Sequence, residues 1–234
     1  MKKQKISHLY NPQPNYTQRP AYLEEDEIKI IETHIESYLG KIDTVFIENP
    51  SDIVNLSIYC LNPTSGRPFH TLITAGMSAL PMEIPSEMEG EASSYLELVI
   101  NLPAEWKLDE ESLKDERNYW PINLLQNTAR FPHKYATWLG FGHSIPNGNP
   151  VEPFASNTVM NASVILPSVV LPPDFHQLIL NSTKEVQFFS IIPLYPEEYK
   201  TYINRGLENL LNIFSLNDVT DILNIDRPNV LEGL

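Results

Sequence analysis

Histidine, cysteine, serine and acidic side chains are the groups in this chain that could do chemistry. The six histidines are His8, His34, His70, His133, His143 and His176. His133 and His143 lie near Glu152 in the sequence, and these three groups could hold a metal ion if they converged in space. Their spacing matches no established site, and neither H-E-x-x-H nor C-x-x-C occurs. We therefore predict no metal ion and no cofactor, with hydrogen-bonded structural or surface histidines as the default.

Two side chains could serve as nucleophiles. Ser78 can be written into a triad with His143 and Asp109, but a chain of this length yields such triples by chance. Cys60 falls in an alternating apolar segment, which favours a buried, inert thiol. G-x-G-x-x-G, P-loop and G-x-S-x-G motifs are absent. The sequence therefore predicts a protein that is not an enzyme, with an unrecognised site near Arg130, His133 and His143 as the alternative.

Six aromatic side chains gather within 23 residues, beside Arg130 and His143. They are Tyr119, Trp120, Phe131, Tyr135, Trp138 and Phe141. Large side chains at this density can fasten a pair of helices to a sheet. They are also typical of binding hot spots, where aromatic residues and arginine line a groove. Both interpretations stay open at the level of sequence.

The net charge narrows the class of partner. The 234 residues include 30 acidic and 16 basic side chains, which gives a net charge of −14. Such a surface repels nucleic acids and anionic membranes, and it attracts basic partners. The stretch 83–117 alone holds 11 acidic and 3 basic residues. It is either a solvated surface or a docking surface for a basic protein, and the overall charge could equally serve solubility alone.

Cysteine usage and hydropathy indicate a compartment. One cysteine permits no intrachain disulfide, which fits a reducing cytosol. The chain has no run of 18 apolar residues, and no apolar segment follows the N-terminal lysines, so we predict a cytoplasmic protein without a membrane span or signal peptide. We expect an extended arm over residues 1–20 and one α/β domain over residues 21–234.

Periodicity predicts the elements that must position these groups. Helical spacing marks 24–39, 121–132 and 195–214, with a last helix starting at Ser215 and running through Leu223. We take Pro121 as the first turn of its helix and Pro132 as its end. Strands are expected at 42–48, 53–61, 69–74, 95–101, 162–166 and 186–192. This order predicts an α/β fold with a mixed, largely antiparallel sheet flanked by helices.

Several segments, taken in order, resemble the suppressor-of-fused (SUFU) domain family. The run 72–82, L-I-T-A-G-M-S-A-L-P-M, is similar to its T-x-G-M-S-x-x-P-M turn, and the run 97–103, E-L-V-I-N-L-P, is similar to its following strand. Further similarities lie at 119–130, at 142–145 and at 192–208. The candidate interaction or motif residues on this resemblance are Gly76, Met77, Ser78, Pro81, Met82, Trp120, Pro121, Arg130, Gly142 and His143.

The resemblance implies a mixed α/β fold and no known catalytic activity. The animal member of the family is a regulator that holds an extended peptide of a transcription factor between this domain and a second one, for which this chain is too short. Short bacterial members look like immunity proteins that neutralise a toxin. We therefore expect a non-enzymatic protein-binding domain of the short bacterial type, most simply an immunity protein with a basic toxin partner. A regulatory or structural subunit of an oligomer is the alternative, because the sequence leaves the oligomeric state open.

Overall fold

The computed structural model describes residues 20–47 and 53–231. Its helices are α1 (Glu25–Leu39), α2 (Glu116–Tyr135), α3 (Pro196–Arg205) and α4 (Leu207–Leu216). Its strands are β1 (Thr44–Ile47), β2 (Ser57–Leu61), β3 (Phe69–Ala75), β4 (Tyr95–Pro103), β5 (Ser144–Pro146), β6 (Ala162–Leu166), β7 (Gln177–Asn181) and β8 (Lys184–Leu194). Short 3-10 turns are η1 (Met77–Ala79), η2 (Ser86–Met88), η3 (Ser112–Lys114) and η4 (Pro173–His176). The arm expected over residues 1–20 lies outside the described residues except for Pro20.

One mixed sheet organises these elements, in the order β1-β2-β3-β4-β8-β6-β5. The strands β1 to β4 form an antiparallel meander, whereas β4 and β8 pair in parallel. The strands β8, β6 and β5 are antiparallel again, and β7 forms a hairpin with the first half of β8. The predicted fold class is therefore confirmed. The hairpin strand β7 was missed, because two prolines just before it suggested only a break in the chain.

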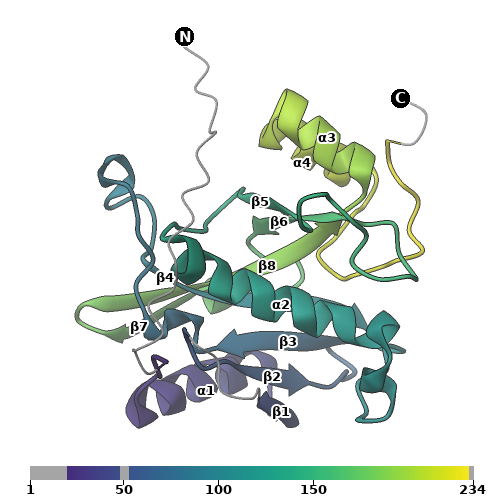
Figure 1. Cartoon of the computed structure of the whole chain (residues 1–234). Coiled ribbons are helices and arrows are strands. Elements are labelled where there is room, and N and C mark those ends of the chain that lie inside the picture. Colours follow the sequence, from purple (N-terminus) through teal and green to yellow (C-terminus); the bar gives the residue numbers. More distant parts are fainter. Residues whose placement is uncertain (1–19, 48–52, 232–234) are drawn as a thin grey trace.

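Helices cover both faces of the sheet (Figure 1). On one face α2 buries Leu125 and Ala129 against Leu72 of β3 and Leu98 of β4. On the other face α1 buries its predicted apolar stripe, including Ile31 and Ile35, against β2, β3 and β8. Each fully buried aliphatic side chain stabilises such a layer by roughly 1.5–3 kcal/mol. The pair α3 and α4 covers β6 and the end of β8. None of these described helices is long and apolar enough to cross a bilayer.

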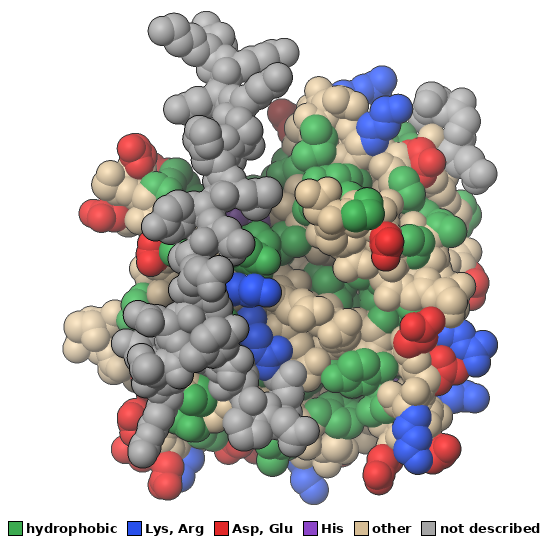
Figure 2. Space-filling model, in the orientation of Figure 1, with side chains coloured by type: hydrophobic (Ala, Val, Ile, Leu, Met, Phe, Trp, Pro, Cys, Tyr) green, Lys and Arg blue, Asp and Glu red, His purple; other side chains and the backbone are tan. Residues whose placement is uncertain are grey.

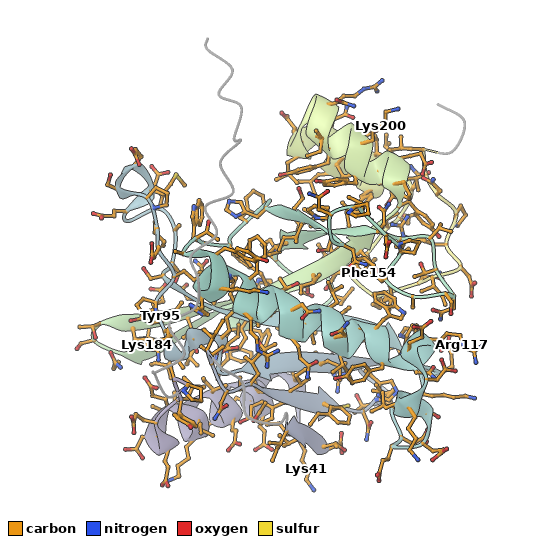
Figure 3. All side chains as sticks on the ribbon, viewed as in Figure 1. Lys41, Tyr95, Arg117, Phe154, Lys184 and Lys200 are labelled. Atoms are coloured by element: carbon orange, nitrogen blue, oxygen red, sulfur yellow. The ribbon has the colours of Figure 1, made fainter. Side chains whose placement is uncertain are left out.

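Lys184, at the start of β8, joins α1 to the β7–β8 hairpin. Its ammonium nitrogen lies 2.9 Å from Glu27 Oε1, and it also lies 5.0 Å from the centroid of the Tyr95 ring (Figure 3). The long side chain of Lys184 is buried, so its charge is satisfied by a carboxylate and an aromatic face rather than by bulk water.

Helix α2 begins earlier than the sequence suggested. Asp115 caps it by accepting a hydrogen bond from the Arg117 backbone nitrogen at 2.9 Å. Pro121 therefore lies inside the helix, where its missing N–H leaves the Arg117 carbonyl without a helical donor. The side-chain amide of Asn157 donates to that carbonyl at 3.1 Å and removes much of the cost. The helix also passes through Pro132 and ends at Tyr135.

The C-terminal part differs from its prediction in two ways. Gly206 has a φ of 85° and divides the expected helix 195–214 into α3 and α4. The helix expected from Ser215 onwards does not form. Asp218 instead has a left-handed φ of 52°, and Ile222 makes an isolated bridge to Asn101 of β4. We call residues 217–231 the C-terminal strap, because they run as irregular chain from the end of α4 back to the central strands β4 and β8, where Asp221 bonds to Asn101 and Ser190.

Candidate functional site

The SUFU-like turn is built around one buried carboxylate, that of Glu97 on β4. Its side chain is 0% exposed. Oε1 accepts from the backbone nitrogens of Gly76 and Ser78 at 2.9 and 3.0 Å and from Ser78 Oγ at 2.6 Å. Oε2 accepts from Thr74 Oγ1 at 2.6 Å. Two segments that resemble the family, 72–82 and 97–103, therefore meet at this single side chain.

Glycine is required at position 76 by both conformation and space. Its φ is 130°, a region that other residues rarely adopt. A Cβ atom there would lie 2.0 Å from the carbonyl oxygen of Asn55, a backbone atom that cannot rotate away. The close approach lets the chain turn from β3 into η1 with two backbone N–H groups aimed at Glu97. The turn therefore resembles an anion-binding loop whose anion belongs to the protein itself.

Burial controls the titration of this group. Desolvation raises the pKa of Glu97 above its usual range, and the hydrogen bonds from Ser78, Thr74 and Gly76 act in the opposite direction. All four donors are neutral, so they stabilise the carboxylate without a compensating positive charge. With no exposed surface, Glu97 and the Ser78 hydroxyl cannot reach a substrate from solvent. The arrangement holds the turn in place.

Residues at and after the C-terminal end of α2 also bond to the same turn. His133 Nε2 lies 2.9 Å from the Met77 carbonyl oxygen, and burial lowers the pKa of this histidine, which favours the neutral ring. Met82 donates its backbone N–H to Ser94 O at 2.8 Å, and its sulfur accepts from the Leu139 backbone nitrogen at 3.4 Å. The side chains of Met77 and Met82 are buried, so they fill the core under α2.

Trp120 and Pro121 anchor the first half of α2. Both are buried. The Trp120 ring stacks on Phe154 with centroids 5.3 Å apart and planes 8° apart, and Trp106 meets it edge-on at 6.0 Å. Phe154 is labelled just above the α2 ribbon in Figure 3. These contacts agree with the interpretation of the aromatic run as a means of fastening helices.

The remaining aromatic residues form separate contacts rather than one lined groove. Phe131 packs on Tyr135 at 4.8 Å, within the last turns of α2. Trp138 meets the ring of His143 edge-on at 4.2 Å. Phe141 is exposed. Because Trp120 lies near the other end of α2, the run 119–141 does not converge on a single pocket.

Gly142 and His143 join the β5–β6 edge to the helix pair α3–α4. Gly142 has a φ of 79°, and a Cβ atom there would lie 2.6 Å from Leu207 Cδ2. Its carbonyl oxygen accepts from the Tyr202 hydroxyl at 2.6 Å. His143 is half-buried, and burial lowers its pKa. The family motif at 142–145 therefore coincides with a packing contact between two layers.

Three of the ten candidate residues keep some surface. Pro81 is exposed, whereas Arg130 and His143 are half-buried. Burial lowers the pKa of Arg130. The other seven candidates are buried, so they present little or no surface for direct contact with another molecule.

Neither the triad nor the metal site that could be written from the sequence assembles. Ser78 Oγ is bonded to Glu97, whereas Asp109 is exposed and accepts from the Ser112 backbone nitrogen at 3.0 Å. Within residues 20–47 and 53–231, no group of three or more metal-ligating side chains is placed to hold an ion. The possible sites at Ser78/His143/Asp109 and His133/His143/Glu152 are therefore not formed.

Cys60 lies buried in β2, as its alternating pattern predicted. Burial raises the pKa of its thiol to about 11. A thiol with this pKa carries almost no thiolate at neutral pH, so it is a poor nucleophile.

The acidic stretch 83–117 is divided by the fold. Its first exposed carboxylates, at 83–91, precede β4, and the second group, at 105–116, follows it. The nine residues of β4 separate them by about 30 Å. Glu97, between the groups, is buried. In Figure 2 acidic side chains gather at well-separated places on this face rather than in one patch. The stretch is therefore two acidic surfaces.

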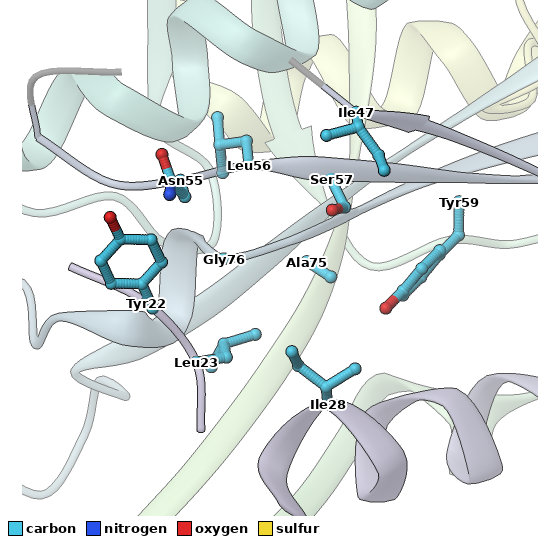
Figure 4. Close-up of a pocket in the computed structure, with 10 residues that line it drawn as sticks. All are labelled: Tyr22, Leu23, Ile28, Ile47, Asn55, Leu56, Ser57, Tyr59, Ala75 and Gly76. Atoms are coloured by element: carbon cyan, nitrogen blue, oxygen red, sulfur yellow. The ribbon is translucent and has the colours of Figure 1, made fainter. Parts of the chain in front are cut away.

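Sequence reasoning missed three features. It quoted Glu97 only as part of a motif. It gave no role to Asp221, a buried carboxylate on the C-terminal strap that accepts from Asn101 Nδ2, Ser190 Oγ and the Val169 backbone nitrogen at 2.8–2.9 Å. It also did not foresee a pocket of about 430 Å³ between α1 and the ends of β2 and β3 (Figure 4). Of these three features, only Glu97 had a signal in the sequence. It is a charged residue within a segment whose other residues are typical of a buried strand.

Comparisons with known proteins agree with this architecture. A crystal structure of a SUFU homologue from Neisseria gonorrhoeae FA 1090 superimposes with a TM-score of 0.62 at 12% identity, covering 90% of this chain and all of that one. The crystal structure of the Sufu–Fu complex gives 0.61 at 18% identity, covering 92% of this chain and 94% of that one. Drosophila Suppressor of Fused gives 0.56 at 18% identity; 94% of this chain corresponds to 54% of that protein. Identities this low establish the fold alone.

A search of curated proteins found no match. The family model described as "Suppressor of fused protein (SUFU)" matches residues 49–228. That range contains the Glu97 turn, the whole of α2 and the C-terminal strap as far as Pro228. The chain therefore belongs to the suppressor-of-fused family.

Proposed function

We propose that this chain is a non-enzymatic protein-binding domain, and that it acts in the cytoplasm as an immunity protein that neutralises a basic toxin. One observation carries the non-enzymatic part. The polar groups best placed for chemistry, Glu97 and Ser78, are bonded to each other and closed off from solvent. A site that must receive a substrate leaves such groups accessible.

Two further observations support binding. The family includes a Sufu protein that was crystallised in complex with Fu. The chain carries a net charge of −14, and most of the carboxylates at 83–116 are exposed. A negative surface draws a basic protein towards it and raises the association rate at low salt. A basic toxin such as a nuclease would meet this surface quickly. The buried, unpaired thiol of Cys60 fits a reducing compartment.

A pull-down from lysate of the source cell, at low and at high salt, tests this function. We expect one basic protein to elute with the chain and to be lost at high salt. The purified pair should then associate with a rate that falls steeply as ionic strength rises, and the complex should suppress the toxic activity of the partner. A partner whose association rate ignores salt would contradict the electrostatic part. Absence of any specific partner at either salt would contradict protein binding.

A further inference from the structure

The pocket in Figure 4 combines an apolar lining with a position at the sheet edge. Tyr22 and Leu23 form one wall, Ile28 of α1 forms another, and the ends of β2 and β3 form the floor. Its volume of about 430 Å³ lies within the range of small-ligand pockets and exceeds that of any single aliphatic side chain.

The outermost strand of the described sheet borders this pocket. In the strand order β1 is terminal, so one of its edges carries no neighbouring strand among the described residues. Ile47 is 82% exposed and lines the pocket, and Val45 is 41% exposed. These two residues pair with Ser57 and Tyr59, which also line the pocket, so all four share one face. An apolar edge that has no neighbouring strand within residues 20–47 and 53–231 is a template for a further strand.

The rim of the pocket is acidic. Ile28 points into it from α1, and Glu25 and Glu32 lie three residues before and four after Ile28, on the same side of the helix. The Tyr59 hydroxyl donates to Glu32 Oε1 at 3.0 Å, which places that carboxylate beside the lining. From Glu24 to Leu39 the sequence has six acidic residues and one basic residue. The region is therefore apolar inside and negative around its border.

We propose that the β1 edge and this pocket bind an extended basic segment of a partner protein. The segment pairs with β1 and places one apolar side chain on Ile47 and into the pocket. Side chains two positions away point to the same side of an added strand, about 7 Å along it. Lysine or arginine at those positions faces the carboxylates of α1. The inference rests on the proposed function, because it needs a protein partner, and it adds the site and the chemistry of recognition.

The probe is a phage library of random 12-residue peptides, selected on the immobilised full chain. Enriched peptides are then synthesised with a fluorophore and titrated by anisotropy. We expect enriched sequences to carry an aliphatic or aromatic residue with Lys or Arg two positions before and after it. Replacing the central apolar residue by Ala, or N-methylating the backbone amides on one edge of the peptide, should each weaken binding at least tenfold.

Two pairs of protein variants assign the site. Ile47→Lys should weaken binding at least tenfold, because it puts a cation at the mouth of the pocket. Ile179→Lys in β7 adds the same charge at a residue that is 70% exposed and outside the pocket, and it should change binding less than twofold. Both positions are exposed, so circular dichroism should show unchanged folding. Glu25→Gln with Glu32→Gln should weaken binding a few-fold and flatten its salt dependence, whereas Glu110→Gln with Glu111→Gln should not.

Four results would overturn this assignment. Failure to enrich any peptide would do so, as would peptides that bind Ile47→Lys as tightly as the unchanged protein. A dimer that light scattering detects and that Ile47→Lys dissociates would show that a second copy of the chain occupies the β1 edge. The partner found in the pull-down distinguishes a wrong binding site from a wrong function. If it binds Ile47→Lys and the unchanged protein equally, the protein-binding function stands and the proposed site is wrong.

Discussion

Two fully buried carboxylates hold this fold by different means. Glu97 and Glu198 are both 0% exposed. Glu97 is surrounded by neutral donors from the end of β3 and from the turn that follows it. Glu198, in the first turn of α3, is paired by Arg227 of the C-terminal strap, with two nitrogen–oxygen distances of 2.5 and 2.7 Å. Arg227 also lies over the rings of Tyr195 and Phe214.

This difference indicates which substitutions should destabilise each region. Around Glu97 the donors come from residues already adjacent in the sheet, so the cluster fixes a local turn. Around Glu198 the cation arrives from a distant segment, so the pair fixes the strap onto the helix layer. Removing a donor from a neutral cluster leaves partial charges, whereas removing a cation leaves a full buried charge.

The largest expected effect comes from removing the cation. Arg227→Ala leaves the buried Glu198 carboxylate without its cation, with the Tyr195 backbone N–H at 2.9 Å still donating to it, and we expect a loss of roughly 3–5 kcal/mol in the free energy of unfolding. Urea denaturation followed by circular dichroism measures it. Arg117→Ala, which breaks an exposed pair with Asp115, is the matched control and should leave stability unchanged. Equal losses for the two variants would refute the importance of burial here.

The turn around Glu97 should break next through its glycine. Gly76→Ala combines an unfavourable φ with a clash against the Asn55 carbonyl, and we expect a loss of about 3 kcal/mol. Gly90 also has a positive φ, of 85°, but open space around it. Gly90→Ala should therefore cost about 1 kcal/mol, for the backbone conformation alone. If the two thermal midpoints fall equally, the close backbone approach is not what requires Gly76.

The same substitution at both carboxylates sharpens the comparison. Glu97→Gln keeps the size and one acceptor oxygen, and the Thr74 hydroxyl can turn to accept from the new amide. We expect it to cost about 1–2 kcal/mol at pH 7. Glu198→Gln leaves Arg227 with an uncompensated charge and should cost more. Equilibrium unfolding of the two variants in one denaturant series decides this order, and the reverse order would contradict it.

The smallest expected effect is a change of the free energy of unfolding with pH. Glu97 has a raised pKa in the folded protein, and its ordinary value near 4.5 applies when unfolded. The folded state thus keeps its proton to higher pH, and stability is lost as pH rises from 4.5 through the folded pKa. Glu97→Gln lacks this loss, so the stability advantage of the unchanged protein should narrow as pH rises. Unfolding curves from pH 4 to 7 measure it. A widening gap would mean that the hydrogen bonds outweigh burial.

Sequence patterns predicted the parts of the fold that depend on local periodicity. The stripe of α1 and its end at Gly40 follow from helical spacing, and the alternation in β2 placed Cys60 inside. The mixed sheet followed from the order of elements. The predicted start of α2 was wrong because it relied on the preference of proline for the first turn of a helix. Pro121 lies inside the helix instead, where the distant Asn157 donates to the Arg117 carbonyl that proline leaves without a donor.

The candidate site was harder to predict, because burial reverses the meaning of residue types. Ser78 and His143 look chemically capable in sequence, yet the first is saturated by Glu97 and the second packs on Trp138. The pocket beside β1 arises where the segment 21–23, α1 and two strand ends meet. Only the end of β3, with Gly76, belongs to a motif, so the pocket itself could be seen only in the tertiary arrangement.

Among the described strands β4 and β8 form the one parallel pair, and this pair also sets an order for assembly of the chain. The strands β1 to β4 contact their neighbours in sequence, so this half can form from local contacts while later residues are still being synthesised. The inner edge of β4 then stays open until β8, far along the chain, arrives beside it. During that interval an apolar strand edge is exposed to other nascent chains. The fold should therefore be most prone to aggregation midway through synthesis, and refolding should be slowest at the closure of β4 on β8.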